Sequence, residues 1–230
     1  MNARSLAVAV LFLRLIGSVQ TRAQSPSPQS TASPEQEAPA QKSEVKDVSP
    51  DKQWGLRFDS DGNPEIVRMG SSEAALQLYD KCGPGLGSCK PLIWAPNSKR
   101  FALNAPNQGR YRPTSFFQLK GDKWEEVELP DAVDDALEKA IAAQMKKKGL
   151  SKNADLRLIS NPVWTAKWID ADTALVYGSK GEVLRKDVEV GFDAAFLFTL
   201  KFNQTGECKI VKSQRLSEKE SQKYDEDSEN

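Results

Sequence analysis

The sequence predicts a mainly β protein of antiparallel four-stranded sheets, either propeller-blade-like or sandwich, with one amphipathic helix inserted at about residues 131–148. Three observations lead to this prediction. Short runs of β-branched and aromatic residues alternate with clusters of turn formers over most of the chain. A single segment has apolar residues at helical spacing. The order of strands and turns occurs twice, once on each side of that segment.

Strand patterns run from residue 53 to the helix and resume after it. Before the helix, β-type runs are expected at Trp54–Phe58, Glu65–Met69, Pro91–Trp94, Arg100–Leu103, Ser115–Leu119 and Trp124–Leu129. After it, similar runs lie at Leu156–Ile159, Thr165–Trp168, Ala174–Tyr177, Ala194–Phe202 and Lys209–Val211. Alternate residues of a strand point to the same face. The aromatic residues of the longest run therefore line one face of it.

The inserted helix is predicted from its apolar stripe and from its ends. The stripe consists of Val133, Ala136, Leu137, Ala140, Ile141 and Met145. Asp131 can cap the start, acidic residues fill the first turns, and Lys146, Lys147 and Lys148 precede Gly149. This charge order suits the helix dipole, and glycine is typical just after a helix. The lysine run is therefore interpreted as a helix end rather than as a phosphate-binding patch.

A weak internal repeat relates the two strand-rich parts. Trp94 and Trp168 each end a strand, and seven residues later Phe101 and Leu175 each lie in the next strand. Both copies continue with a longer loop, a strand, a polar turn and a last strand. This is the plan of a four-stranded antiparallel sheet, and it predicts two such sheets with the helix between them.

The first copy also carries a family resemblance. Trp94-Ala-Pro-Asn-Ser-Lys-Arg-Phe-Ala-Leu resembles the Trp-Ser-Pro-Asp-Gly-Lys signature of TolB-like (PD40) β-propeller repeats, with Asn97 and Ser98 in place of the usual Asp-Gly. The resemblance implies blade-like sheets and surfaces for protein contacts. A propeller needs about four blades or more, whereas this chain offers two predicted sheets and a leading hairpin. Propeller-like sheets and a sandwich both remain open.

The two ends of the chain differ in composition from the middle. Residues 1–23 combine Arg4, an apolar run and the small residue Ala23, which is the pattern of a secretory signal peptide. Residues 24–52 are expected to be a disordered Pro/Ser/Gln-rich spacer, residues 53–216 a single mainly β domain, and residues 217–230 an acidic disordered tail. We therefore expect a secreted or periplasmic protein. No later stretch approaches the ~20 apolar residues of a membrane span, so an integral membrane protein is not expected.

The three cysteines raise the question of a disulfide, because an exported protein meets an oxidising compartment. Cys82 and Cys89 close a glycine-rich turn, and we predict a bridge between them. Such a short loop gains only about 2.5 kcal/mol, so the bridge would hold a loop rather than the domain. Cys208 lies in a predicted strand and is interpreted as a small core residue without a partner, although pairings through it stay open.

The absence of histidine excludes several kinds of chemistry. Without it there is no Ser–His or Cys–His nucleophile pair and no His-ligated zinc site, and three cysteines cannot build a four-thiolate one. We expect no cofactor and no metal. The whole chain has 32 basic and 32 acidic residues, and this balance does not suggest nucleic acid as a partner. Oligomeric state cannot be read from these features.

These observations predict a non-catalytic binding module whose ligand is a protein or a component of the cell envelope. Tyr111, Trp164 and the Cys82–Cys89 loop are the candidate contact residues. The simpler interpretation places both aromatic residues in the core. One alternative is a carboxylate-based glycan hydrolase, in which Asp170 and Asp172 beside Trp168 would be the reacting pair. Another is a structural or assembly protein of the envelope.

Overall fold

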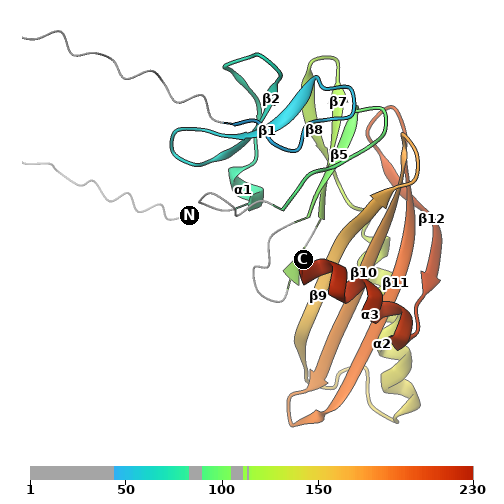
Figure 1. Cartoon of the computed structure of the whole chain (residues 1–230). Helices are drawn as coiled ribbons and strands as arrows, with labels where there is room; N and C mark the ends of the chain where they lie inside the picture. The colour runs from blue at the N-terminus through green and yellow to red at the C-terminus, as the bar shows by residue number, and fades with distance from the viewer. Residues whose placement is uncertain (1–43, 83–89, 105–110, 113, 230) are drawn as a thin grey trace, which may run out of the picture. The chain divides into compact units, whose positions relative to one another are not determined.

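The computed structural model describes residues 44–82, 90–104, 111–112 and 114–229, and within them the chain is mainly β (Figure 1). A first sheet, of order β1-β2-β3, is formed by β1 (Trp54–Phe58), β2 (Pro64–Arg68) and β3 (Ala74–Gln77). It leads into the short helix α1 (Tyr79–Cys82). The predicted leading hairpin is thus present, with a third strand added.

The second sheet is the first copy of the predicted four-stranded plan. Its order is β4-β5-β7-β8, from β4 (Ile93–Trp94), β5 (Arg100–Asn104), β7 (Thr114–Lys120) and β8 (Lys123–Val127). All neighbouring strands in it are antiparallel. Trp94 ends the edge strand β4, as the repeat predicted, and it lies opposite Phe101 on β5.

The third sheet is the second copy and has much longer strands. Its order is β12-β11-β10-β9, from β9 (Leu156–Trp168), β10 (Thr173–Leu184), β11 (Asp187–Phe202) and β12 (Cys208–Arg215). The short strand β6 (Tyr111–Arg112) adds to the β9 edge in parallel. The fold class predicted from the sequence is therefore confirmed, including the repeated four-stranded order.

Helix α2 (Ala132–Lys147) connects the second sheet to the third and covers one face of the latter. Its buried residues are Val133, Leu137, Ala140, Ile141 and Met145, five of the six residues of the predicted stripe, and the sixth, Ala136, is half-buried. Gly178 lets the helix approach, because a Cβ there would lie 3.2 Å from a ring carbon of Phe198 and 3.6 Å from Leu137. Gly149, at φ +73°, ends the helix as predicted. Asp131 precedes it, but its side chain makes no capping hydrogen bond.

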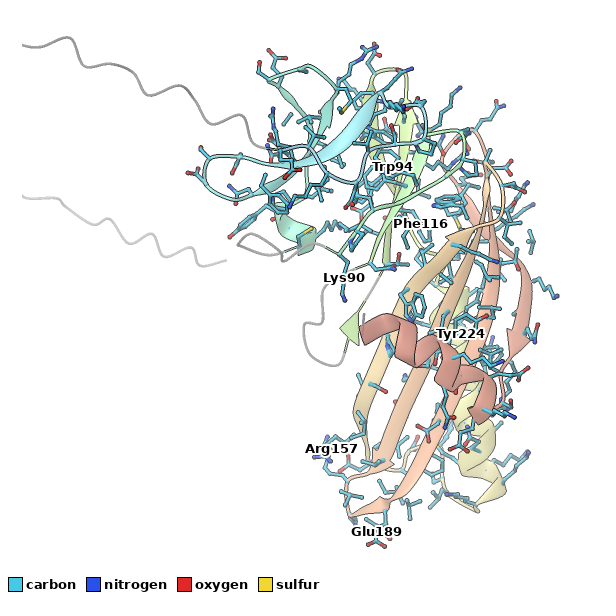
Figure 2. The ribbon with its side chains drawn as sticks, viewed as in Figure 1. Lys90, Trp94, Phe116, Arg157, Glu189 and Tyr224 are labelled. Atoms are coloured by element: carbon cyan, nitrogen blue, oxygen red, sulfur yellow. The ribbon has the colours of Figure 1, made fainter. Side chains whose placement is uncertain are left out.

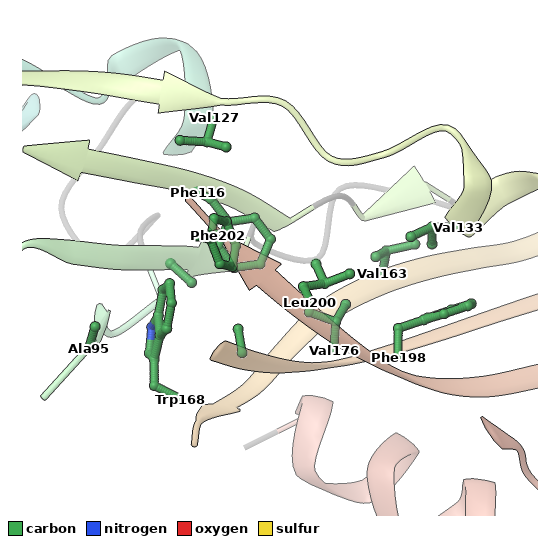
Figure 3. Close-up of a cluster of buried hydrophobic side chains, with 12 residues drawn as sticks. Ala95, Phe116, Val127, Val133, Val163, Trp168, Val176, Phe198, Leu200 and Phe202 are labelled. Carbon is green, nitrogen blue, oxygen red and sulfur yellow. The ribbon is translucent and has the colours of Figure 1, made fainter. Parts of the chain in front are cut away.

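Buried clusters join successive sheets. Aromatic residues of the first and second sheets pack together, with ring centroids between 4.8 and 5.7 Å apart, and they are Trp54, Trp94, Phe101, Phe117 and Trp124. Figure 3 shows the cluster between the second and third sheets, in which Phe116, Trp168 and Phe202 are in mutual contact. The burial of these large apolar side chains stabilises the packing of each sheet against the next.

The two tryptophans of the repeat make equivalent hydrogen bonds. Trp94 donates its indole N–H to the carbonyl oxygen of Asp47 at 2.6 Å, and Trp168 donates its own to the carbonyl oxygen of Ile93 at 2.8 Å. Asp47 belongs to the segment before the first sheet, and Ile93 belongs to β4 of the second sheet. Each tryptophan therefore connects the end of its strand to a part of the structure that lies earlier in the sequence.

Both predicted ends of the domain need correction. Residues 44–52 of the expected spacer are ordered, because Lys46 bridges to Leu56 and the Asp47 carboxylate accepts the N–H of Leu92 at 3.1 Å, and residues 24–43 lie outside the described residues. The expected disordered tail, residues 217–230, instead forms helix α3 (Glu218–Glu229). Composition alone missed both, because each segment is polar and is ordered by contacts with residues distant in sequence. Within the described residues, no helix is long and apolar enough to cross a membrane.

Candidate binding site

The third sheet has two faces with different coverings. Phe192, Ala194 and Phe198 point to the face that α2 covers. Tyr177 points the other way, and the register places Trp164 and Leu197 directly opposite it on the neighbouring strands. Residues directly opposite in an antiparallel pair share a face. Trp164 and Tyr177 therefore lie side by side on the face away from α2, which we call the outer face.

Helix α3 covers these two rings. Figure 2 labels Tyr224 on this helix. Tyr224 stacks on Tyr177, with centroids 5.3 Å apart and an interplanar angle of 11°, and lies 6.1 Å from Trp164. Trp164 and Tyr177 are themselves 5.7 Å apart. We call Trp164, Tyr177 and Tyr224 the aromatic triad. Under this cover Tyr177 is fully buried and Trp164 half-buried.

The helix is attached to the sheet just before its first residue. Leu216 is buried and donates its N–H to the carbonyl oxygen of Ala195 at 2.9 Å. The carboxylate of Glu220 accepts both the N–H and the hydroxyl of Ser217, at 2.8 and 2.7 Å. This is one half of a capping box, in which a residue of the first turn reaches back to the cap. The start of α3 is thus fixed locally, and Tyr224 provides its aromatic contact with the sheet.

One polar group of the triad has no partner. The indole N–H of Trp164 is buried and makes no hydrogen bond among the described residues. A buried donor left unpaired costs about 1–3 kcal/mol. Among the described residues, three further buried side-chain atoms also lack a partner, namely Trp124 Nε1, Arg157 Nε and Asn161 Oδ1.

Lysines occupy the part of the outer face next to the triad. The register continues from Tyr177 through Leu175 to Thr173, and it places Lys167, Lys201, Lys209 and Lys212 on the same face. We call these four the lysine strip. Lys201 pairs with Asp172, while the other three are exposed. The rings of Trp164 and Tyr177, next to the lysine strip, suit an anionic ligand that carries a ring or another flat apolar group.

A like-charge contact lies where α3 begins. Desolvation, together with the negative charge of Glu218, raises the pKa of Asp193 on β11. The described side chains of α3, from Glu218 to Tyr224, make no ion pair with the sheet. Electrostatics therefore opposes rather than supports this end of the docked helix.

The candidate contact residues predicted from the sequence have different outcomes. Trp164 lies on the outer face, in contact with two rings, rather than in the main core. Tyr111 lies in β6 next to β9, and its side chain is outside what the structure describes. Cys82 is buried at the end of α1, but Cys89 lies outside the described residues, so their pairing stays a prediction. Cys208 is a free cysteine, and burial raises the pKa of its thiol to about 12.

The two carboxylates considered for hydrolysis share one tight turn. Asp170 accepts the N–H of Asp172 at 2.9 Å, and this hydrogen bond is the main reason that the pKa of Asp170 falls to about 2. Asp172 pairs with Lys201. A general acid in a glycosidase needs a raised pKa and a partner across a cleft. These groups instead have the geometry of turn residues. Among the described residues, no group of three or more His, Cys, Asp or Glu could hold a metal ion.

Sequence reasoning missed Tyr177, Tyr224 and the lysine strip. The sequence predicts that Tyr177 lies in a strand. It does not predict which face of the sheet the side chain takes, because β-bulges shift the register on both β9 and β12. Tyr224 is the single aromatic residue of the acidic tail. An isolated tyrosine in an otherwise polar segment was the available signal, since such a residue gains most from docking on another surface.

Comparison with known proteins adds no family. A scan against protein-family models matches nothing, and a search of curated protein sequences finds no significant relative. The resemblance of the Trp94 segment to TolB-like repeats therefore stays a hypothesis.

Proposed function

We propose that this protein is an extracytoplasmic, non-catalytic binding module whose ligand is a protein or a component of the cell envelope. The observation that carries the proposal is the aromatic triad. Two large rings of the outer face, Trp164 and Tyr177, are covered by a single helix, α3, through one ring, that of Tyr224. Aromatic residues of this kind dominate the energetics of protein interfaces.

Location and chemistry support the same proposal. The N-terminal pattern of residues 1–23 favours export. The chain has no histidine, and the carboxylates Asp170 and Asp172 are engaged in a turn. The resemblance to TolB-like repeats, which commonly serve protein contacts, agrees with a binding role. Fold-level analogy does not by itself carry a function, so the outer face has to be tested directly.

The test is photo-crosslinking on intact cells that produce the full-length chain. A photoreactive residue in place of Lys167 reports on the outer face, and one in place of Val188, at the far end of β11, is the matched control. We expect a discrete crosslinked species from the first position and none from the second. The species should weaken in a Trp164→Ala background and persist in Trp164→Phe, which keeps an aromatic ring and separates loss of contact from loss of folding.

The same cells test the location. Cleavage after residue 23 and recovery of the processed chain outside the cytoplasm are expected. Crosslinks that are equal at both positions, or absent from both in the exported protein, would rule out the outer face as the binding surface.

A further inference from the structure

We infer that the outer face of the third sheet binds an acidic helical peptide that carries an aromatic residue, and that α3 occupies this site in the free protein as an internal copy of that ligand. The inference rests on the proposed function and names the class of partner. Its first basis is the occupant itself, because α3 is seated on Trp164 and Tyr177 through one ring, that of Tyr224.

The charges of the two surfaces are complementary. Residues 217–230 contain six acidic residues and two lysines. On the outer face, the lysine strip lies next to Trp164 and Tyr177. An acidic helix can therefore approach along this face under electrostatic attraction and place a ring on Trp164 and Tyr177.

The contact between α3 and the sheet is weak enough for another helix to replace α3. The hydrogen bonds from Ser217 to Glu220 hold the first turn of α3, and the attachment of the chain to the sheet, through Leu216, comes before the helix. The described side chains of α3 make no ion pair with the sheet, and Glu218 lies near the like-charged Asp193. An aromatic pair contributes about 0.5–1.5 kcal/mol beyond its area. A partner that repeats the ring and improves on the charges can therefore replace α3.

The experiment uses the full processed chain and a fluorescent synthetic peptide with the sequence of residues 217–230. Fluorescence anisotropy measures binding to the wild type and to Tyr224→Ala, in which the internal ring is removed. Because α3 competes in the wild type, we expect Tyr224→Ala to bind the peptide at least about tenfold more tightly. A peptide carrying Tyr224→Ala should bind neither protein.

Charge variants test the lysine strip in the Tyr224→Ala background. Lys167→Gln with Lys212→Gln should weaken peptide binding about fivefold, because the acidic peptide loses part of its electrostatic attraction to the outer face. Lys99→Gln with Lys123→Gln, two exposed lysines of the second sheet, is the matched control and should leave it unchanged. Raising the salt concentration should weaken binding in proportion to the charges involved.

Three results would overturn the inference. They are equal peptide binding by the wild type and Tyr224→Ala, no binding by a folded Tyr224→Ala protein, and equal binding of the peptides with and without tyrosine. In each of these cases the crosslinking at Lys167 decides the wider proposal separately, because it needs no particular partner chemistry. Persistent Trp164-dependent crosslinks would then keep the binding function and reject only the acidic aromatic helix.

Discussion

The guanidinium of Arg100, on β5, donates a hydrogen bond to the carbonyl oxygen of Asn203, in the β11–β12 turn, at 2.9 Å. A second N–H of the same group reaches the carbonyl oxygen of Ala171 at 2.9 Å, and the third bonds the side chain of Gln118 at 3.1 Å. Arg100 is buried, and burial lowers its pKa, which nearby Asp172 partly offsets. One side chain of the second sheet thus holds two turns of the third.

Arg100→Met is expected to destabilise the protein by about 2–3 kcal/mol, because it removes the donor of three hydrogen bonds, one of them to the buried side chain of Gln118. Arg100→Lys keeps the charge but not the planar fork, so it should recover only part of the loss. Urea unfolding measures both. Lys99→Ala, at the exposed neighbouring position, is the control and should change the free energy of unfolding by less than about 0.5 kcal/mol. An Arg100→Met protein as stable as the wild type would contradict the bridging role.

The tryptophans of the third sheet should respond differently to the same substitution. Trp168→Phe removes the N–H that bonds the carbonyl oxygen of Ile93, and we expect it to cost about 1–2 kcal/mol. Trp164→Phe removes a buried N–H that has no partner, so it should cost less or even stabilise the fold. Thermal unfolding of the two variants provides the comparison. Equal losses would show that ring size, rather than the hydrogen bond, sets the stability at both positions.

The contribution of Asp193 to the docking of α3 should strengthen as the solution becomes acidic, whereas Glu220, whose pKa the hydrogen bonds from Ser217 lower, acts in the opposite direction. The pKa of Asp193 is raised above its ordinary value of 3.8, so the folded state binds this proton more tightly than the unfolded state does. The stabilisation from protonation is therefore complete below pH 3.8 and is lost as the pH rises through the folded-state pKa. Ring-proton chemical shifts of Tyr224 report on docking across this range. In Asp193→Asn the strengthening in acid should disappear and leave only the weakening due to protonation of Glu220, and a strengthening that persisted there would assign it to another group.

Thiol counting tests the cysteines without any structural variant. The raised pKa of Cys208, about 12, leaves little thiolate at pH 8, so the native protein should react slowly with iodoacetamide. If Cys82 and Cys89 are bridged as predicted, unfolding without reductant should expose one reactive thiol, and reduction should expose three. Mass spectrometry gives both numbers. Three reactive thiols before reduction would exclude the bridge.

Much of the fold was predictable because it follows from local patterns. Alternation of β-type runs and turn formers predicted the strands, and the stripe from Val133 to Met145 predicted α2. The order of strands around Trp94 and Trp168 predicted two four-stranded sheets. Each of these signals lies within a short window of sequence, where side-chain period and turn chemistry decide the outcome.

The candidate site depended on tertiary structure. The chain continues as one strand through Pro162, where two short strands were expected, because β6 and β10 flank β9 on its two sides. Bulges then decide which face each later residue takes, since one extra residue reverses the alternation. Trp164 reaches the outer face only through this register.

The sequence by itself determined a mainly β chain with a repeated sheet order, one amphipathic helix and no histidine chemistry. The tertiary structure alone decided that a polar, acidic tail becomes helix α3 and that Tyr224 meets Trp164 and Tyr177. The physical reason is that a single ring in a polar segment gains free energy only when strands from distant parts of the chain assemble a surface for it. A local sequence pattern therefore cannot predict that surface.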